Sequence, residues 1–195
     1  QMANKDAAFG MKPVRMIGGA PYSGGTSRYR IAANYGTSIF QGDMVAQVTG
    51  GTVEVHADGG TVPIVGVFNG CQFTDPTTGE QVFQNFYPAS TNASDIIAFI
   101  VDDPNVVYEV QADDTFPVAD LFGNFDIVYT SSGSTQTGIS GAELDVTTGA
   151  TNTNLPIKAI DISQDPNNDD VASANTNVLV VIQNSIFGVK GAGLA

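Results

Sequence analysis

Lysine and arginine are missing from most of this chain. None occurs from Ile31 to Ile157, although fifteen aspartates and glutamates lie in the same span. Five of the seven basic residues fall within residues 1–30, where Asp6 is the only acid, so this segment carries +4 and the remainder −17 of the net −13. The acidic body disfavours nucleic-acid binding, which requires a clustered basic surface. The basic segment alone could contact phosphate, but its cations are interleaved with glycine, proline and aromatic residues, which fits a polypeptide partner with an acidic face at least as well, so we expect no nucleic-acid partner. The sequence predicts a basic N-terminal arm, residues 1–30, on an acidic body, residues 31–195.

Other scarce residues exclude further classes of protein. Cys71 is the only cysteine, so the chain forms no internal disulfide, and we expect this thiol to be a small buried group. The longest apolar run, Ile96 to Val101, has six residues, far fewer than the roughly 20 that span a bilayer, so no membrane partner is expected. His56 is the only histidine, which excludes a histidine-rich metal site, and the lack of tryptophan weakens the case for a sugar-cleaving cleft.

Long amphipathic helices are absent, and short apolar segments recur between turn-forming residues. This pattern predicts an all-β fold, an antiparallel β-sandwich or barrel with an extended, non-helical N-terminal arm and at most one or two short helices. The best helix candidate is Phe116 to Phe122, with Thr115 as its N-cap and Gly123 as its end. Strands are expected near residues 28–33, 43–49, 52–56, 62–69, 81–86, 95–101, 106–112, 125–130, 142–147, 155–162 and 177–184.

Turn signals suggest how these strands connect. Gly50-Gly51, Asp58-Gly59-Gly60 and the segment 75–79 have the glycines and proline of tight turns, which predicts an antiparallel meander over residues 43–86. Polar loops follow at 131–141, 147–154 and 165–177. The body is therefore either one domain with long loops or two β subdomains divided near residues 117–124.

Residues with catalytic or metal-binding chemistry are few. His56 has no Gly-x-Ser-x-Gly elbow to partner it, so an ordinary strand position is favoured over catalysis. The adjacent acids at 102–103, 113–114 and 169–170 are expected to be solvated rather than paired in a cleft. Residues 165–170 resemble the start of a calcium loop but lack its glycine and its final glutamate, so a polar turn is favoured. We predict no enzymatic activity, no metal site and no cofactor.

The basic arm alternates large side chains with glycine and proline, which disfavours a helix or an inner strand. Two interpretations remain open. The arm either becomes ordered on a partner, docking its side chains into pockets, or lies as an edge segment on its own body. The candidate docking residues are Lys5, Phe9, Lys12, Pro13, Arg15, Ile17, Tyr22, Arg28, Tyr29 and Arg30.

Several phrases of the sequence carry a family likeness. The opening AFGMKPVR at residues 8–15, followed by GAPY at 19–22, resembles the start of structural virion proteins of tailed bacteriophages, especially phages of aquatic bacteria. The resemblance continues over most of the chain, in IFQGDMV at 39–45, PIVGVF at 63–68, VYEVQA at 107–112 and SANTNVLVVI at 173–182. These are β-rich phrases without chemistry of their own.

The resemblance implies a protein of the phage head. A shell-forming capsid protein is one alternative, but that fold usually contains a long spine helix. A compact β body with a basic arm resembles instead a decoration (cement) protein, which binds the major capsid protein on the head exterior, often as a dimer or trimer, after assembly in the bacterial cytoplasm. The other alternative is a receptor- or carbohydrate-binding virion module, whose site would lie in the polar loops.

Overall fold

The computed structural model describes residues 3–188; residues 1–2 and 189–195 of the predicted arm and body lie outside them. The described residues form twelve strands and two three-residue 3-10 helices, η1 (Val118–Asp120) and η2 (Pro166–Asn168), arranged in two six-stranded antiparallel sheets. The all-β prediction is therefore confirmed. None of the described helical segments is long enough to cross a membrane.

The N-terminal sheet has the order β2-β7-β5-β3-β4, with β6 paired to the far end of β5. Its core is a cluster of buried side chains that includes Phe68, Tyr87 and Ile100. Its strands are β2 (Ser27–Arg30), β3 (Met44–Val48), β4 (Thr52–Val55), β5 (Ile64–Thr74), β6 (Gln81–Gln84) and β7 (Ile97–Val101).

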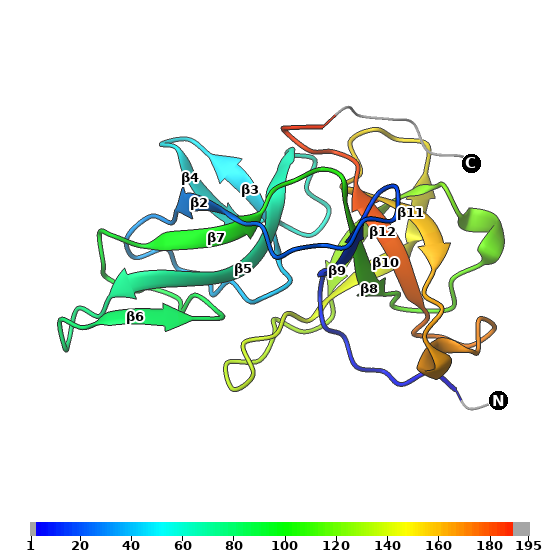
Figure 1. Ribbon diagram of the computed structural model, residues 1–195, viewed down its shortest axis with the longest axis horizontal. Helices are drawn as coiled ribbons and strands as arrows, with labels where there is room; N and C mark the ends of the chain where they lie inside the picture. The colour runs from blue at the N-terminus through cyan, green and yellow to red at the C-terminus, as the bar shows by residue number, and fades with distance from the viewer. Residues whose placement is uncertain (1–2, 189–195) are drawn as a thin grey trace.

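The C-terminal sheet has the order β1-β8-β12-β11-β9-β10 and occupies the other half of the molecule (Figure 1). Its apolar alternation is clearest in β12, where Val178, Val180 and Ile182 are buried and the residues between them are not. A bridge from Ala112 to Leu144 brings β10 beside the end of β8, so this sheet curls on itself. Its strands are β1 (Lys12–Met16), β8 (Val106–Gln111), β9 (Asn124–Tyr129), β10 (Ala142–Ala150), β11 (Ile157–Ile162) and β12 (Asn177–Ile182).

The two sheets pack together through shared side chains and backbone bonds. The core of the C-terminal sheet also contains Met44, Ile64 and Val67 from the N-terminal sheet. The backbone N–H of Ile64 donates to the carbonyl of Asn184 at 2.7 Å, and the N–H of Ser140 donates to the carbonyl of Gln41 at 2.9 Å. The interface thus combines apolar packing with buried hydrogen bonds.

All eleven expected strands are present, but two details of the connectivity differ from the predictions. The chain changes sheet between β1 and β2 and again at residues 102–105, whereas residues 117–124 connect β8 and β9 of the C-terminal sheet. The hairpins at Gly50-Gly51 and at 75–79 exist, yet β4 does not pair with β5, because β3 lies between them. The meander predicted over residues 43–86 is therefore wrong at its second joint.

The helix expected at Phe116–Phe122 is only the 3-10 turn η1. Pro117 takes the N-cap position in an extended conformation with no side-chain cap, so Thr115 does not cap it. Phe116 is fully buried against Phe125, with ring centroids 5.4 Å apart, and the N–H of Phe122 donates to the carbonyl of Ala159. Phe122 also has a φ of 71°, outside the right-handed helical region, so the segment ends after a single 3-10 turn.

Candidate functional site

Residues 3–30 are built into both sheets. Among the strands of residues 3–188, β1 pairs with β8 alone and forms an edge of the C-terminal sheet, while β2 pairs with β7 alone and forms an edge of the N-terminal sheet. The segment between them crosses from one sheet to the other (Figure 1). The structure thus has the second of the two arrangements expected for the arm, an edge segment on its own body.

Close backbone contacts at Gly10 fix the position of the chain just before β1. The N–H of Met11 donates to the carbonyl of Gly42 at 2.8 Å. Gly10 has φ +70°, and a Cβ there would lie 2.6 Å from the Cβ of Ser140 and 2.8 Å from the Gly42 carbonyl oxygen. Only glycine combines this conformation with such close approach of two backbones. Met11, next in the chain, is consequently held in the core, 1% exposed.

The cations of β2 face solvent. Arg28 and Arg30 are exposed and alternate with Tyr29, which packs on the core of the N-terminal sheet. The hydroxyl of Tyr29 donates to a carboxylate oxygen of Asp102 at 2.7 Å. The Arg28 guanidinium lies 5.8 Å from the centre of the Phe99 ring, close enough for a cation–π contact. Because side chains alternate along a strand, both guanidinium groups face solvent, while Tyr29 between them packs on the core and holds the strand in place.

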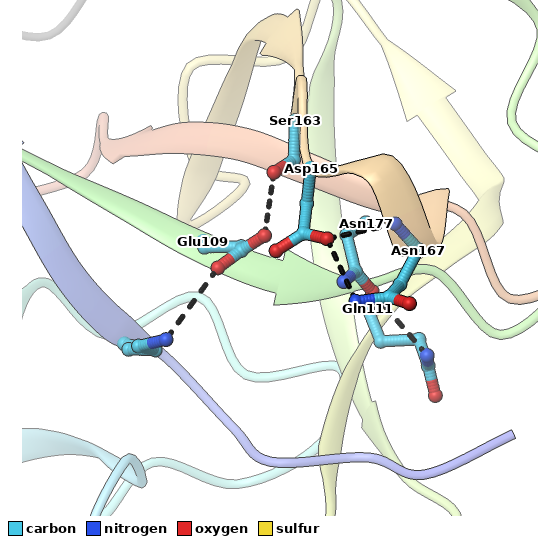
Figure 2. A network of polar contacts seen from close by, with 7 residues as sticks. Glu109, Gln111, Ser163, Asp165, Asn167 and Asn177 are labelled. Atoms are coloured by element: carbon cyan, nitrogen blue, oxygen red, sulfur yellow. Dashed lines mark hydrogen bonds and ion pairs between the residues drawn. The ribbon is translucent and has the colours of Figure 1, made fainter. Parts of the chain in front are cut away.

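The two cations of β1 differ in their exposure and in their contacts. Lys12 is exposed and lies 3.9 Å from Glu109, whose other carboxylate oxygen accepts from the Ser163 hydroxyl at 2.6 Å (Figure 2). Arg15 is half-buried and donates to the carbonyl of Met16 at 3.4 Å. Pro13 can occupy β1 because an edge strand leaves its N position unpaired, and the register shifts immediately after it.

The apolar residues predicted to dock are mostly used within the chain. Phe9 is half-buried beside Met11, and Tyr22 packs against the core of the C-terminal sheet. Ile17 is the exception, with 54% of its surface exposed. The structure therefore leaves cations rather than aromatic rings available on this segment, and Lys5 is exposed with them.

A buried amide anchors the residues that precede β1. Gln111, 3% exposed at the end of β8, accepts a hydrogen bond from the N–H of Ala7 and donates to the carbonyl of Lys5, each at 2.9 Å. Its amide also donates to the side chain of Asn177 at 3.3 Å (Figure 2). Asn4 donates in turn to the carbonyl of Asp170 at 3.0 Å. These contacts were not predicted, since nothing local marks Gln111 as different from other strand glutamines.

Replacing Gln111 with methionine should detach residues 4–9 without unfolding the sheet. Methionine keeps the length of the side chain but removes both bonds to the N-terminal segment, so we expect a loss of roughly 2 kcal/mol in the free energy of unfolding. Hydrogen exchange at the amide of Ala7 should become faster. The matched control is Gln81→Met on the exposed edge strand β6, where neither quantity should change. Unchanged exchange at Ala7 in the Gln111→Met variant would contradict the anchoring role.

The other residues considered for catalysis or metal binding are buried in the fold or hydrogen-bonded within it. Cys71 is 1% exposed and burial raises its pKa to about 12, which confirms the small buried thiol. Asp165 accepts from the N–H of Asn167 at 2.8 Å and so caps η2, the polar turn favoured for this segment (Figure 2). Asp102 is engaged by Tyr29, and an oxygen of Asp113 accepts from the N–H of Val146 at 3.0 Å. Within residues 3–188, no three metal-ligating side chains gather.

His56 follows β4 instead of lying within it and is 2% exposed. The backbone N–H of His56 donates to the carbonyl of Met44 at 2.8 Å, and the backbone carbonyl of His56 accepts from the Tyr129 hydroxyl at 2.9 Å. Burial lowers the pKa of the imidazole. The predicted strand position was one residue too long at this end.

Comparison of the chain with protein-family models, with characterised proteins and with solved structures finds no match.

Proposed function

We propose that this protein is a non-enzymatic structural component of a tailed-phage virion that binds the outer face of the head shell and stabilises it, as a decoration (cement) protein does. The observation that carries the proposal is the placement of Lys12, Arg15, Arg28 and Arg30 on two edge strands that belong to different sheets. Rigid strands hold these charges at fixed spacing, and the segment joining them spans both halves of the molecule.

The charges on the rest of the surface would orient the protein so that the edge formed by β1 and β2 faces an acidic partner. The fully exposed charged side chains on the remainder of the described surface are carboxylates, among them Asp58, Glu80, Asp114 and Asp161. A partner with an acidic face, such as an acidic outer surface of the major capsid protein, would be attracted to the basic edge and repelled by the other faces. A body this acidic also suits the head exterior, away from the phosphates of the packaged genome. We further propose that copies associate as dimers or trimers on the shell.

The secondary-structure content favours this role over that of a shell-forming capsid protein. The resemblance implies a long spine helix for a shell subunit, whereas the helical elements among residues 3–188 are two segments of three residues each. Decoration needs no such helix.

Co-sedimentation with empty shells of the parent phage tests the proposal. The full chain should bind saturably at low salt and lose much of its affinity at moderate salt, because contacts between exposed charges are screened within a Debye length of about 10 Å at 0.1 M. Shells should also resist heating better with the protein bound. Absence of binding at low salt would refute the decoration role.

A further inference from the structure

The face of the N-terminal sheet that is turned away from its core, here called the outer face, carries basic and apolar side chains next to one another. Strands β2, β7, β5 and β6 lie side by side in the left half of Figure 1. Ile97 of β7 is opposite Arg30 of β2, and Gln72 of β5 is opposite both Ile97 and Phe83 of β6. Opposite residues of antiparallel strands share a face, and neighbouring strands are about 4.8 Å apart, so this row of four side chains is about 14 Å wide.

The row faces solvent. Cys71 and Phe73, which alternate with Gln72 along β5, belong to the buried core of the sheet. On the other side of the sheet, Phe83 is 66% exposed, the largest exposed fraction among the large hydrophobic side chains of residues 3–188. Ile97 is half-buried beside it in the row. Single exposed apolar side chains are common, but here they are aligned across neighbouring strands and end at an arginine.

A second arginine on this face lies beside an aromatic ring. Arg28 is opposite Phe99 in the pairing of β2 with β7, and its guanidinium is 5.8 Å from the centre of the ring. Neither Arg28 nor Arg30 has an ion-pair partner among residues 3–188. The strands β2, β5, β6 and β7 contain no acidic residue, and Asp95, which precedes β7, accepts hydrogen bonds from the N–H and hydroxyl of Thr74. The strands that carry the two positive charges therefore do not neutralise them.

The spacing of the two arginines matches that of alternate side chains in an extended chain. Arg28 and Arg30 are two residues apart in a strand, which rises about 3.3 Å per residue, so their Cα atoms are about 6.6 Å apart. Carboxylates at alternate positions of an extended segment have the same spacing, and a guanidinium pairs well with a carboxylate. When such a segment lies along β2, the residues between its carboxylates point toward β7, where Ile97 and Phe99 provide apolar surface.

A polypeptide fits this face better than a single-stranded nucleic acid, although bases also stack on aromatic rings. Nucleic acid carries a negative charge on every nucleotide, and its binding requires many cations. This face has two cations on a chain of net charge −13, so a polyanion that extends past them would be repelled by exposed carboxylates such as Glu80. A polypeptide can confine its carboxylates to the positions that meet an arginine.

We propose that the outer face of β2 and β7 binds an extended segment of the major capsid protein in which carboxylates alternate with apolar side chains. The carboxylates pair with Arg28 and Arg30, the apolar side chains rest on Ile97 and Phe99, and Phe83 borders this surface. The origin of the segment rests on the proposed function, because the shell is the partner proposed there. The chemistry of the face does not depend on it.

The chain has three arginines, which makes a direct test specific. The full chain is titrated at neutral pH and low salt with a capped hexapeptide of alternating glutamate and leucine, and the side-chain Nε–H signals of Arg15, Arg28 and Arg30 are followed by NMR. The signals of Arg28 and Arg30 should shift saturably. The analogue with glutamine in place of glutamate should bind at least about tenfold more weakly. Lack of a saturable shift at Arg28 and Arg30, equal binding of the glutamine analogue, or tighter binding of an oligothymidylate of eight nucleotides would overturn the proposal.

A substitution in the centre of the face locates the contact. Ile97→Thr keeps a β-branched residue in the strand but removes apolar surface, and it should weaken binding of both the peptide and empty shells about tenfold or more. Ile160→Thr, at a half-buried position of β11 in the C-terminal sheet, is the matched control and should bind both like the parent chain. Amide spectra that superimpose away from the substitutions establish that both variants are folded. Equal peptide affinities in the two variants would place the contact elsewhere and refute the assignment.

Shell binding by the same variants separates this proposal from the decoration role. Shells that bind the parent chain and Ile97→Thr equally would refute the docking of the capsid segment on this face and leave the decoration role standing. Shells that bind neither the parent chain nor the variants would refute the decoration role, and with it the origin of the segment, whatever the peptide shows.

Discussion

Lowering the pH from about 7 to about 5 is expected to stabilise this protein against unfolding. The main cause is Asp43, 3% exposed between the sheets, where burial raises the pKa of its carboxyl from 3.8 to about 6 even though Phe40 and Ser140 donate hydrogen bonds to it. Between these two pKa values the folded state binds a proton that the unfolded state does not. Stability is therefore fully present below about pH 4 and is lost as the pH rises through 6.

The size of this effect is large for a single side chain. A rise in pKa from 3.8 to about 6 corresponds to about 3 kcal/mol. Burial also raises the pKa of Asp113, Asp126 and Glu143, which act in the same direction. His56 acts in the opposite direction, because its pKa is lowered by burial and the unfolded chain gains a proton below pH 6.5 that the folded chain does not accept. The carboxyls outnumber it, so the net slope between pH 4 and 6 should follow them.

Urea unfolding at a series of pH values measures this effect. Asp43→Asn resembles the protonated carboxyl and should flatten the profile between about pH 4 and 6, with stability at neutral pH at least equal to that of the parent chain. Asp43→Ala is the matched control. It also removes the titrating carboxyl, so its profile should be flattened as well, but because it leaves the N–H of Phe40 unpaired it should be roughly 1–3 kcal/mol less stable than Asp43→Asn at every pH. A parent profile that falls on acidification over this range, or one that Asp43→Asn leaves unchanged, would contradict the assignment.

Met11→Ala should destabilise the protein strongly although it lies in the segment predicted to be an arm. The side chain is 1% exposed and belongs to the core of the C-terminal sheet, so its truncation leaves a cavity and should cost about 2–5 kcal/mol of unfolding free energy. A free arm would tolerate the change. The measurement is the midpoint of urea or thermal unfolding.

Ile17 provides the matched control for Met11. It lies six residues further along the same segment, is 54% exposed, and outside any core cluster, so Ile17→Ala should change the unfolding free energy by about 0.5 kcal/mol or less. Equal effects of the two substitutions would show that residues 3–30 are not built into the sheets as described.

Local sequence patterns correctly predicted most of the strands and two of the hairpins. Alternation and turn glycines located eleven strands and the hairpins at Gly50-Gly51 and 75–79. β1 was missed because Pro13 and the surrounding glycines disfavour a strand, whereas an edge position tolerates them. The change of sheet at 102–105 was missed because a short polar link between two apolar strands has the same local pattern as a hairpin. Which strands pair is decided by contacts distant in the sequence.

The contacts around the candidate site could not be predicted from local sequence. The division of charge drew attention to residues 1–30, but it did not indicate that Tyr29 and Met11 face inward or that Gln111 anchors the segment. A cavity of about 510 Å³ beside His56 could not be inferred either, because its walls come from three segments that meet only in the folded chain. Nothing in the sequence around His56 indicates that this residue lines a cavity.

We propose that folded edge strands, and not a detachable arm, present the charges that dock on the shell. The most direct test is co-sedimentation of three variants with empty shells at low salt. One replaces Lys12, Arg15, Arg28 and Arg30 with glutamine, lowering the net charge from −13 by four. The second places the same four units of negative charge elsewhere, with glutamates at the exposed positions Thr77, Gln136, Thr151 and Asn154. The third lacks residues 1–9.

The first variant should lose binding while its unfolding midpoint shows that it is folded, and the other two should retain most of it. Loss of binding on removing residues 1–9, with binding kept by the glutamine variant, would contradict the account and return the docking role to a flexible arm.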